Sequence, residues 1–185
     1  MYSPIHNNIK LQPKTVPPGI EVMSCPESGG QWISSAAYWK WRETLAEPIP
    51  NLDLGRPEGQ DLAREDSAAG KRCPVDGAFL IRHRVGHGLD FYLDRCGMCG
   101  GVWLDAGEWE ALQARGLHDD LHLIFSSAWQ AEVRRQQRSE ADERLLLKRL
   151  GEADLNKTKA IRRWIESHPE ANLIQTILDG DFDSN

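Results

Sequence analysis

The sequence lacks any apolar run close to the roughly 18 residues that a membrane-spanning helix needs. Its first residues, MYSPIHNNIKLQPK, also lack the apolar centre of a secretory signal. We therefore expect a cytoplasmic protein that makes no use of a membrane. With 40% hydrophobic and 27% charged residues, the 185-residue chain can still bury a core.

The sequence also lacks an excess of positive charge, since its formal net charge is −6. Sequence-independent binding to nucleic acid requires a basic surface that displaces counterions. The basic clusters are Arg82-His83-Arg84 and the arginines Arg134, Arg135 and Arg138, and each has acidic residues nearby. Charge runs of this kind are more often solvated faces. Nucleic acid is therefore a partner that the composition allows but does not favour.

Cysteine is scarce, and its placement is informative. Three of the four cysteines lie between positions 73 and 99, which suits a metal site in a reducing compartment better than a disulfide framework. The sequence has no glycine-rich phosphate loop and no nucleophile signature. We therefore expect a protein that is not an enzyme and has no small-molecule substrate.

A β-hairpin is predicted between the clustered cysteines. The stretches AFLIRHRV and LDFYLDR alternate apolar and polar residues on either side of Gly86-His87-Gly88. This hairpin brings Cys73-x-x-Asp76 and Cys96-x-x-Cys99 to one end. His87 lies at the other end, about 30 Å away at ~3.3 Å per residue. We therefore exclude His87 as a ligand and expect His83, in mid-strand, to be an ordinary packed or surface histidine.

The predicted metal site consists of Cys73, Asp76, Cys96 and Cys99, holding one Zn²⁺ per chain, because zinc accepts carboxylate oxygen as well as thiolate sulfur. An alternative stays open, in which Asp76 is only a turn residue and water completes the site. Such an open site would permit catalysis, which we consider the weaker interpretation because thiolate-rich sites on glycine knuckles are usually closed and structural. A redox role for Cys96-x-x-Cys99 is weaker still, since the motif lacks a βαβ context.

An internal repeat precedes this site. At an offset of 71 residues, Cys25 aligns with Cys96 and Trp32 with Trp103, and at an offset of 70, Ser3 and His6 align with Cys73 and Asp76. The first copy keeps Cys25, with His6 as a potential second donor. Because structural zinc requires four donors, we expect this copy to be a ribbon-shaped module without metal.

The predicted fold class is α+β, with two small β-hairpin zinc-ribbon-like modules followed by a helical C-terminal region. The expected boundaries are a degenerate module at 1–45, a flexible linker rich in Pro, Gly and acids at 46–72, a zinc ribbon with a capping helix at 73–115, and a helical tail at 116–185. Within the ribbon, Asp105-Ala-Gly-Glu108 has capping-box spacing, which predicts that Asp105 begins that helix.

The tail should contain one long helix and two shorter ones. Its first apolar stripe consists of Leu121, Ile124, Phe125, Ala128 and Trp129. Residues 134–144 are almost wholly polar before leucines resume at 145–150. We expect the middle of the long helix to be solvated or to lie along a partner. The last helix should begin near Pro169 and end at Asp179-Gly180.

The strings CPVDG, GLDFYLDRC and CGMCGGVWLDAGEWEAL resemble the short zinc-ribbon domain named for transcription factor IIB. The resemblance covers about 40 residues of the second copy and implies the ligand set Cys73, Asp76, Cys96 and Cys99. The first copy, with C-P-x-S-G-G-x-W, is similar to a degenerate member. Zinc binding is the function that the resemblance implies, and its transcription label is a fold-level analogy.

These features together predict a non-enzymatic adaptor, in which a structural zinc ribbon presents surfaces for protein–protein interaction. We expect the partner to be another protein or a second copy bound through the long helix. The alternative is a transcription-associated or nucleic-acid-binding ribbon.

Overall fold

The structure is a computed structural model that describes residues 1–45 and 70–180. The predicted linker, residues 46–72, lies outside the described residues except for its last three. The chain divides into two compact units, Met1–Val133 and Arg134–Asn185, which we describe separately. The α+β class is confirmed, since the first unit consists of strands and short helices and the second unit is helical.

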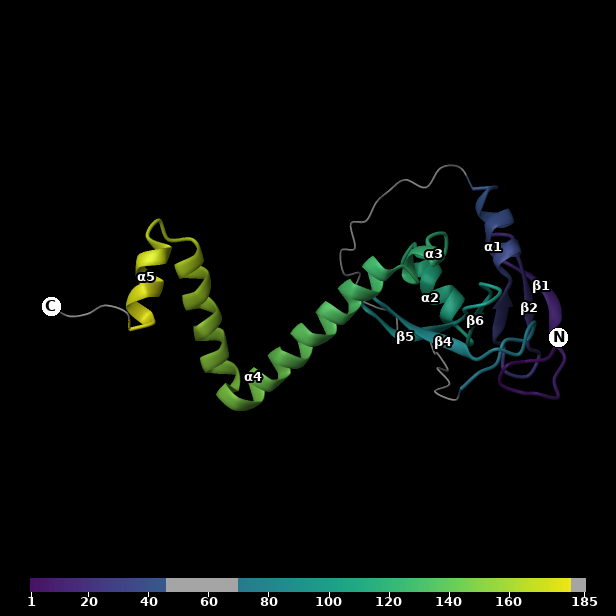
Figure 1. Cartoon of the computed structure of the whole chain (residues 1–185), viewed down its shortest axis with the longest axis horizontal. Helices are drawn as coiled ribbons and strands as arrows, with labels where there is room; N and C mark the ends of the chain where they lie inside the picture. Colours follow the sequence, from purple (N-terminus) through teal and green to yellow (C-terminus); the bar gives the residue numbers. More distant parts are fainter. Residues whose placement is uncertain (46–69, 181–185) are drawn as a thin grey trace. The chain divides into compact units, whose positions relative to one another are not determined.

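The first unit contains a six-stranded sheet in the order β1-β2-β3-β6-β5-β4 (Figure 1). Every pair of neighbouring strands is antiparallel. The strands are β1 (Gln12–Val16), β2 (Ile20–Ser24), β3 (Gln31–Ile33), β4 (Leu80–Gly86), β5 (Leu89–Cys96) and β6 (Val102–Leu104). The helices of this unit are α1 (Ser35–Arg42), α2 (Glu108–Ala114), α3 (Leu121–Ile124) and the first turns of α4 (Ser127–Glu166).

The two repeat copies meet at the centre of the sheet, where β3 pairs with β6. Trp32 lies opposite Trp103, with Gln31 opposite Leu104 and Ile33 opposite Val102. Because Trp103 is also the repeat equivalent of Trp32, this pair lies on an approximate two-fold axis. The strand order has the same symmetry, with β1, β2 and β3 of one copy mirrored by β4, β5 and β6 of the other. The two predicted modules therefore form one continuous sheet.

Two glycines permit this close pairing. A Cβ atom added at Gly30 would lie 2.2 Å from Cζ2 of Trp103, and one added at Gly101 would lie 2.2 Å from Cζ2 of Trp32. Each indole thus packs directly on the backbone of the other copy. Only glycine leaves room for such an approach.

The core has two parts, one on each face of the sheet. The first cluster packs the helices on Val22, Ile33, Phe91, Leu93 and other strand residues. The second cluster joins the two central tryptophans to the knuckle cysteines, and its buried members are Leu11, Cys25, Trp32, Cys73, Leu80, Cys96 and Trp103. The metal-site candidate and the seam between the copies therefore share one small core.

The helices also connect the two copies. The indole N–H of Trp109 in α2 donates to the carbonyl of Pro17, in the β1–β2 turn, at 2.7 Å. The Tyr38 hydroxyl in α1 donates to the carbonyl of Asp119 at 2.6 Å, and burial raises the pKa of Tyr38 to about 12. The first copy is thus held both by α2 of the second copy and by the loop that follows α2.

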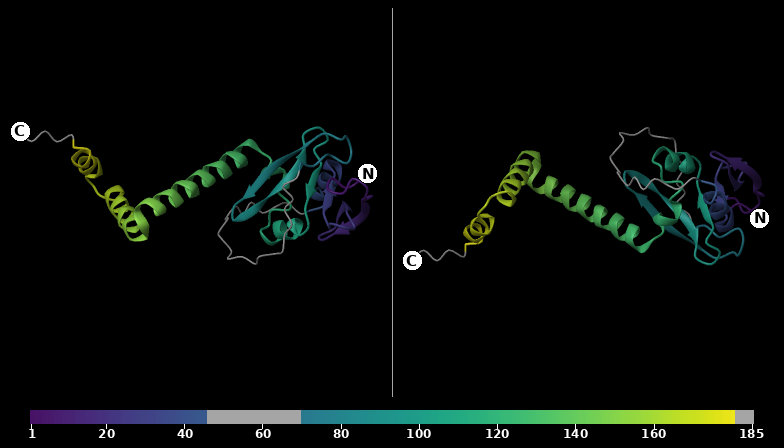
Figure 2. Two further views of the ribbon diagram at one scale, coloured as in Figure 1. Left: turned by 90° about the horizontal axis from the view of Figure 1, so that it is seen from below. Right: turned by 90° about the horizontal axis from the view of Figure 1, so that it is seen from above.

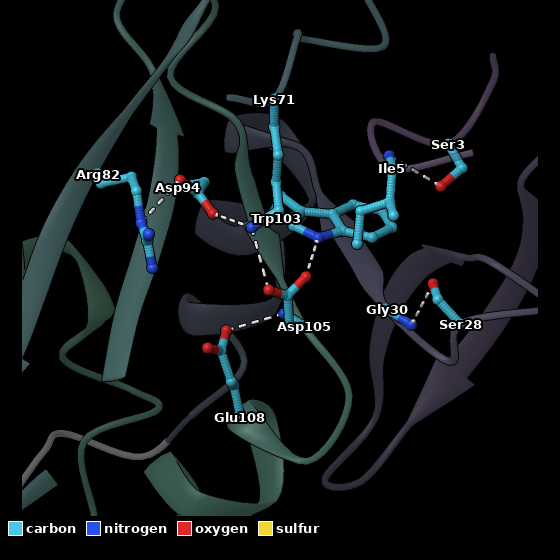
Figure 3. Close-up of polar contacts among 10 residues, drawn as sticks. All are labelled: Ser3, Ile5, Ser28, Gly30, Lys71, Arg82, Asp94, Trp103, Asp105 and Glu108. Carbon is cyan, nitrogen blue, oxygen red and sulfur yellow. Dashed lines mark hydrogen bonds and ion pairs between the residues drawn. The ribbon is translucent and has the colours of Figure 1, made fainter. Parts of the chain in front are cut away.

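A buried ion cluster lies beside Trp103. Lys71 Nζ is 2.6 Å from Asp94 Oδ2 and 3.0 Å from Asp105 Oδ2, and all three side chains are at most 3% exposed (Figure 3). The two carboxylates raise the pKa of Lys71 although burial opposes them, so the ammonium is charged. Asp105 also accepts the indole N–H of Trp103 at 2.6 Å. Lys71 therefore anchors the chain immediately before the first knuckle.

The prediction that Asp105 caps α2 is only half right. Its backbone N–H donates to Glu108 Oε2 at 2.8 Å, which is one arm of a capping box. Its carboxylate is instead engaged by Lys71 and Trp103. The N-cap of α2 is Gly107, with φ of 81° and no side-chain cap.

The predicted apolar stripe of the tail is buried only in part, since Phe125 is half-buried and Ala128 is exposed, and it spans two helices. Leu121 and Ile124 belong to α3, and Trp129 belongs to α4, which begins at Ser127. The indole N–H of Trp129 donates to the carbonyl of Val85 at 2.8 Å. The start of α4 is thus part of the first unit.

The second unit consists of the rest of α4 and α5 (Ala171–Leu178). Within it, α4 bends at Gly151, whose φ of 76° and ψ of 165° are not helical (Figure 2). Among the described residues of this unit, Leu155 is the one buried side chain. The described helices include none with the length and apolarity needed to cross a membrane.

We expect Gly30→Ala and Gly101→Ala each to destabilise the first unit by about 3 kcal/mol, because the new methyl group would overlap an indole ring at the seam. Denaturant unfolding followed by tryptophan fluorescence measures this loss. Gly70→Ala is the matched control, since nothing lies within 4 Å of its added Cβ. Equal stability of all three variants would contradict the proposed role of the seam.

Candidate metal centre

Two glycine-containing turns bring the four predicted ligands together. In the first turn, the N–H of Gly77 donates to the carbonyl of Cys73 at 3.0 Å, and in the second, Gly100 donates to Cys96 at 3.1 Å. Both glycines have positive φ, 76° and 71°, which L side chains rarely adopt. Pairing of β4 with β5 aligns the turns, with Leu80 opposite Cys96.

One ligand atom from each of Cys73, Asp76, Cys96 and Cys99 lies within 4.8 Å of all the others. The sulfurs of Cys73 and Cys99 are 3.6 Å apart, and the sulfur of Cys96 is 3.2 Å from Oδ2 of Asp76. Tetrahedral zinc requires about 3.8 Å between two sulfurs and about 3.6 Å between sulfur and oxygen, given its bond lengths of roughly 2.3 and 2.1 Å. The cluster therefore fits one zinc ion with small adjustments.

Backbone N–H groups of the turns point at the sulfurs. Val75 donates to the sulfur of Cys73, and Met98 and Cys99 both donate to the sulfur of Cys96, each at 3.4 Å. Three thiolates and one carboxylate around a dication leave two net negative charges. Donors of this kind offset that charge and hold the sulfurs in position.

The carboxylate of Asp76 has two roles at this site. Its Oδ1 accepts the N–H of Ala78 at 3.0 Å, as a turn aspartate does, while Oδ2 faces the sulfur of Cys96. The turn interpretation and the ligand interpretation are therefore compatible, since the turn hydrogen bond fixes the carboxylate and leaves one oxygen for a metal. This backbone bond, with the thiol of Cys96, lowers the pKa of Asp76.

The thiols of Cys73 and Cys99 have the opposite shift. Burial raises the pKa of Cys73 to about 12 and also raises the pKa of Cys99. The metal-free site at neutral pH thus holds an ionised carboxylate and at least two protonated thiols. Metal binding must displace the thiol protons.

The two histidines that we expected not to be metal ligands, His87 and His83, lie outside the metal-site candidate. The ring of His87, in the β4–β5 turn, packs 4.2 Å from Trp129, and the ring of His83 packs 5.1 Å from Phe125.

Two arginines near the knuckles pack on aromatic rings: Arg72 lies 3.9 Å above Phe79, and Arg95 lies 5.1 Å from Phe125.

The geometry defines a zinc ribbon, in which two knuckles at the end of a β-hairpin present a Cys₃Asp donor set. Residues 72–115 match the family described as transcription factor zinc-finger, the TFIIB-type zinc ribbon. This segment is therefore a TFIIB-type zinc-ribbon domain with a metal-site candidate at Cys73, Asp76, Cys96 and Cys99. Such ribbons are usually non-catalytic. Comparison with curated proteins and with solved structures gives no match.

The first copy keeps the turns but has hydroxyls in place of two sulfurs. Ser3 Oγ accepts the N–H of Ile5, and Ser28 Oγ accepts the N–H of Gly30, each at 3.3 Å (Figure 3). Cys25 is 1% exposed. Burial acts to raise its pKa, but hydrogen bonds from Ser28 and Ser3 outweigh burial, so the pKa is lowered. A hydrogen-bonded network thus occupies the position that corresponds to the metal site.

Sequence reasoning missed Lys71, which it placed at the end of the linker. The side chain is buried between Asp94 and Asp105, and it positions the strand that enters the first knuckle. The repeat alignment pairs Lys71 with Met1 and so gives no signal of a buried charge.

We expect Asp76→Ala to weaken zinc binding by more than the roughly 10–100-fold typical of losing an outer-shell partner, because it removes a direct ligand. Asp76→Cys, which restores four thiolates, should bind zinc with at least the affinity of the wild-type chain. Competition with a chromogenic chelator measures both. Unchanged affinity in Asp76→Ala would mean that water completes the site.

Zinc affinity should fall steeply as the pH is lowered, because Cys73 and Cys99 are protonated in the metal-free site and zinc competes with their protons. Two displaced protons correspond to a loss of about 100-fold per pH unit near neutrality. Calorimetry in buffers of different ionisation enthalpy counts these protons. Asp76→Asn should release the same number, since Asp76 is already ionised, and release of fewer than two would contradict the assigned protonation states.

Proposed function

We propose that this protein is a non-enzymatic adaptor, in which a zinc-stabilised ribbon unit carries a helical region that binds another polypeptide. The observation that carries the proposal is the second unit, whose apolar side chains are exposed instead of forming a core. Those exposed side chains are Leu145, Leu146, Leu147, Leu150, Ile161, Trp164, Leu173, Ile177 and Leu178.

The metal site supports a structural role for zinc. Four protein donors leave a tetrahedral ion no open position for water or substrate, whereas a catalytic zinc keeps one. The buried sulfurs are also tied to the core through Trp32 and Trp103. Zinc in this position would stabilise the sheet, and the binding surface would lie elsewhere.

The helical unit supports the presence of a partner. Helices in water obtain most of their stability from packing of an apolar face, and α5 has a markedly amphipathic sequence but no buried residue. Contiguous exposed apolar side chains of this kind mark interaction surfaces. A second copy of the chain or a different protein would supply the missing core.

The charge distribution gives less support to nucleic acid as the partner. Arg84 pairs with Asp90 at 2.7 Å, and Arg82 lies 3.8 Å from Asp94 and above the ring of Tyr92. The basic residues of β4 are thus largely neutralised by their own strand partners. Transcription-associated binding remains the alternative function suggested by the ribbon family.

Hydrogen–deuterium exchange on the full-length chain tests the adaptor proposal. In the dilute monomer, amides of residues 134–178 should exchange at least ~100-fold faster than those of β5 and β6, because helices without a core open readily. Protection should appear at high concentration if the partner is a second copy, or in a purified complex if it is another protein. Leu146→Glu with Leu150→Glu should abolish that protection.

Lys148→Gln is the matched control on the same helical segment and should retain the protection. Slow exchange throughout residues 134–178 in the dilute monomer would contradict the proposal, because the helical unit would then be stable without a partner.

A further inference from the structure

The two ribbon copies differ at one equivalent position next to the central tryptophans. In the second copy, Lys71, Asp94 and Asp105 fill the space beside Trp103, and the indole N–H of Trp103 donates to Asp105. Every polar group named here has a partner, and the three charged side chains are almost fully buried. This part of the second copy is therefore a closed polar core.

The first copy has none of these charges. The residues at the equivalent positions are Met1, Met23 and Ser34, beside Trp32. The strand pairing confirms the correspondence, since Met23 lies opposite Trp32 just as Asp94 lies opposite Trp103. Two flexible methionines and a hydroxyl thus replace an ammonium and two carboxylates.

This replacement leaves a pocket of about 470 Å³. Met1, Met23, Trp32 and Ser34 all line it, together with residues of β1, β2 and the first turn of α1. Its volume lies within the roughly 300–1,000 Å³ typical of small-molecule sites. The lining includes one side chain of each charge sign, Lys14 and Glu21, so it does not select for an ion.

One residue of the pocket lining, Trp32, carries a hydrogen-bond donor that has no acceptor among the described residues and is closed to solvent. Trp32 is 1% exposed, and its buried indole Nε1 has no acceptor in the described part of the chain. Ser34 has a different role, because its hydroxyl accepts the N–H of Ala37 at 3.1 Å and caps α1. A buried N–H without an acceptor is unusual in native proteins and calls for a partner.

We propose that this pocket, the Trp32 pocket, binds a small neutral molecule with an aliphatic body, and that Met1 and Met23 move aside so that a carbonyl oxygen of this molecule accepts the Trp32 indole hydrogen bond. Methionine side chains adapt readily to apolar ligands, and the carbonyl takes the place that Asp105 occupies in the second copy. Trp32 shares a core cluster with the knuckle cysteines, but the pocket contains no metal ligand and lies within the first unit, so the proposal goes beyond the adaptor function.

The test is a titration of the zinc-loaded, full-length chain with pentanamide, followed by ¹H–¹⁵N NMR of the indole N–H groups. Trp32→Phe identifies the Trp32 resonance. We expect a saturable downfield shift of this resonance at millimolar ligand. The Trp103 resonance is an internal control and should not move, because its N–H already donates to Asp105.

Ser34→Asp copies the second repeat by placing a carboxylate beside Trp32. It should shift the Trp32 resonance without ligand and weaken the response to pentanamide at least tenfold. Ala36→Asp, which adds the same charge at an exposed position in the same helical turn, should respond like the wild-type chain. The proposal is overturned if the Trp32 resonance does not shift, if Trp103 shifts equally without saturation, or if Ser34→Asp responds normally.

Discussion

The packing of Trp32 and Trp103 on each other's glycine backbone is the interaction on which the rest of the first unit depends. It fixes the β3–β6 register, and that register joins the three strands of each copy into one six-stranded sheet. A ribbon of about 40 residues is too small to build a sufficient core alone. By pairing the copies around an approximate two-fold axis, the chain increases the apolar surface that each copy can bury.

This pairing explains how the copies could diverge in chemistry. The second copy holds its knuckles with a Cys₃Asp donor set suited to zinc, while the first keeps the same turns with the hydroxyls of Ser3 and Ser28. The hydroxyls suffice because the seam and the helices of the second copy already restrain the first. The same asymmetry appears beside the tryptophans, where Lys71 and its two carboxylates in the second copy correspond to a pocket in the first.

The helical unit differs from the first unit in the exposure of its apolar side chains. The first unit buries all of its tryptophans except Trp39, whereas the second exposes Trp164 and a series of leucines and isoleucines. Zinc and the seam would stabilise only the sheet, which is why we propose that a partner supplies the core for the helices. The division of the chain after Val133 thus separates a self-sufficient unit from one that we propose is completed by binding.

The sequence alone determined the hairpin, the turn at Gly86–Gly88, the Cys₃Asp donor set and the repeat, because these depend on local periodicity, glycine conformation and ligand spacing. It also predicted the long helix with its solvated middle. Only the tertiary structure decided the β3–β6 pairing, the burial of Lys71 and the break between α3 and α4. These features depend on contacts between residues that are far apart in the sequence. Lys71 is buried because Asp94 and Asp105 neutralise it, and no local sequence pattern indicates those contacts.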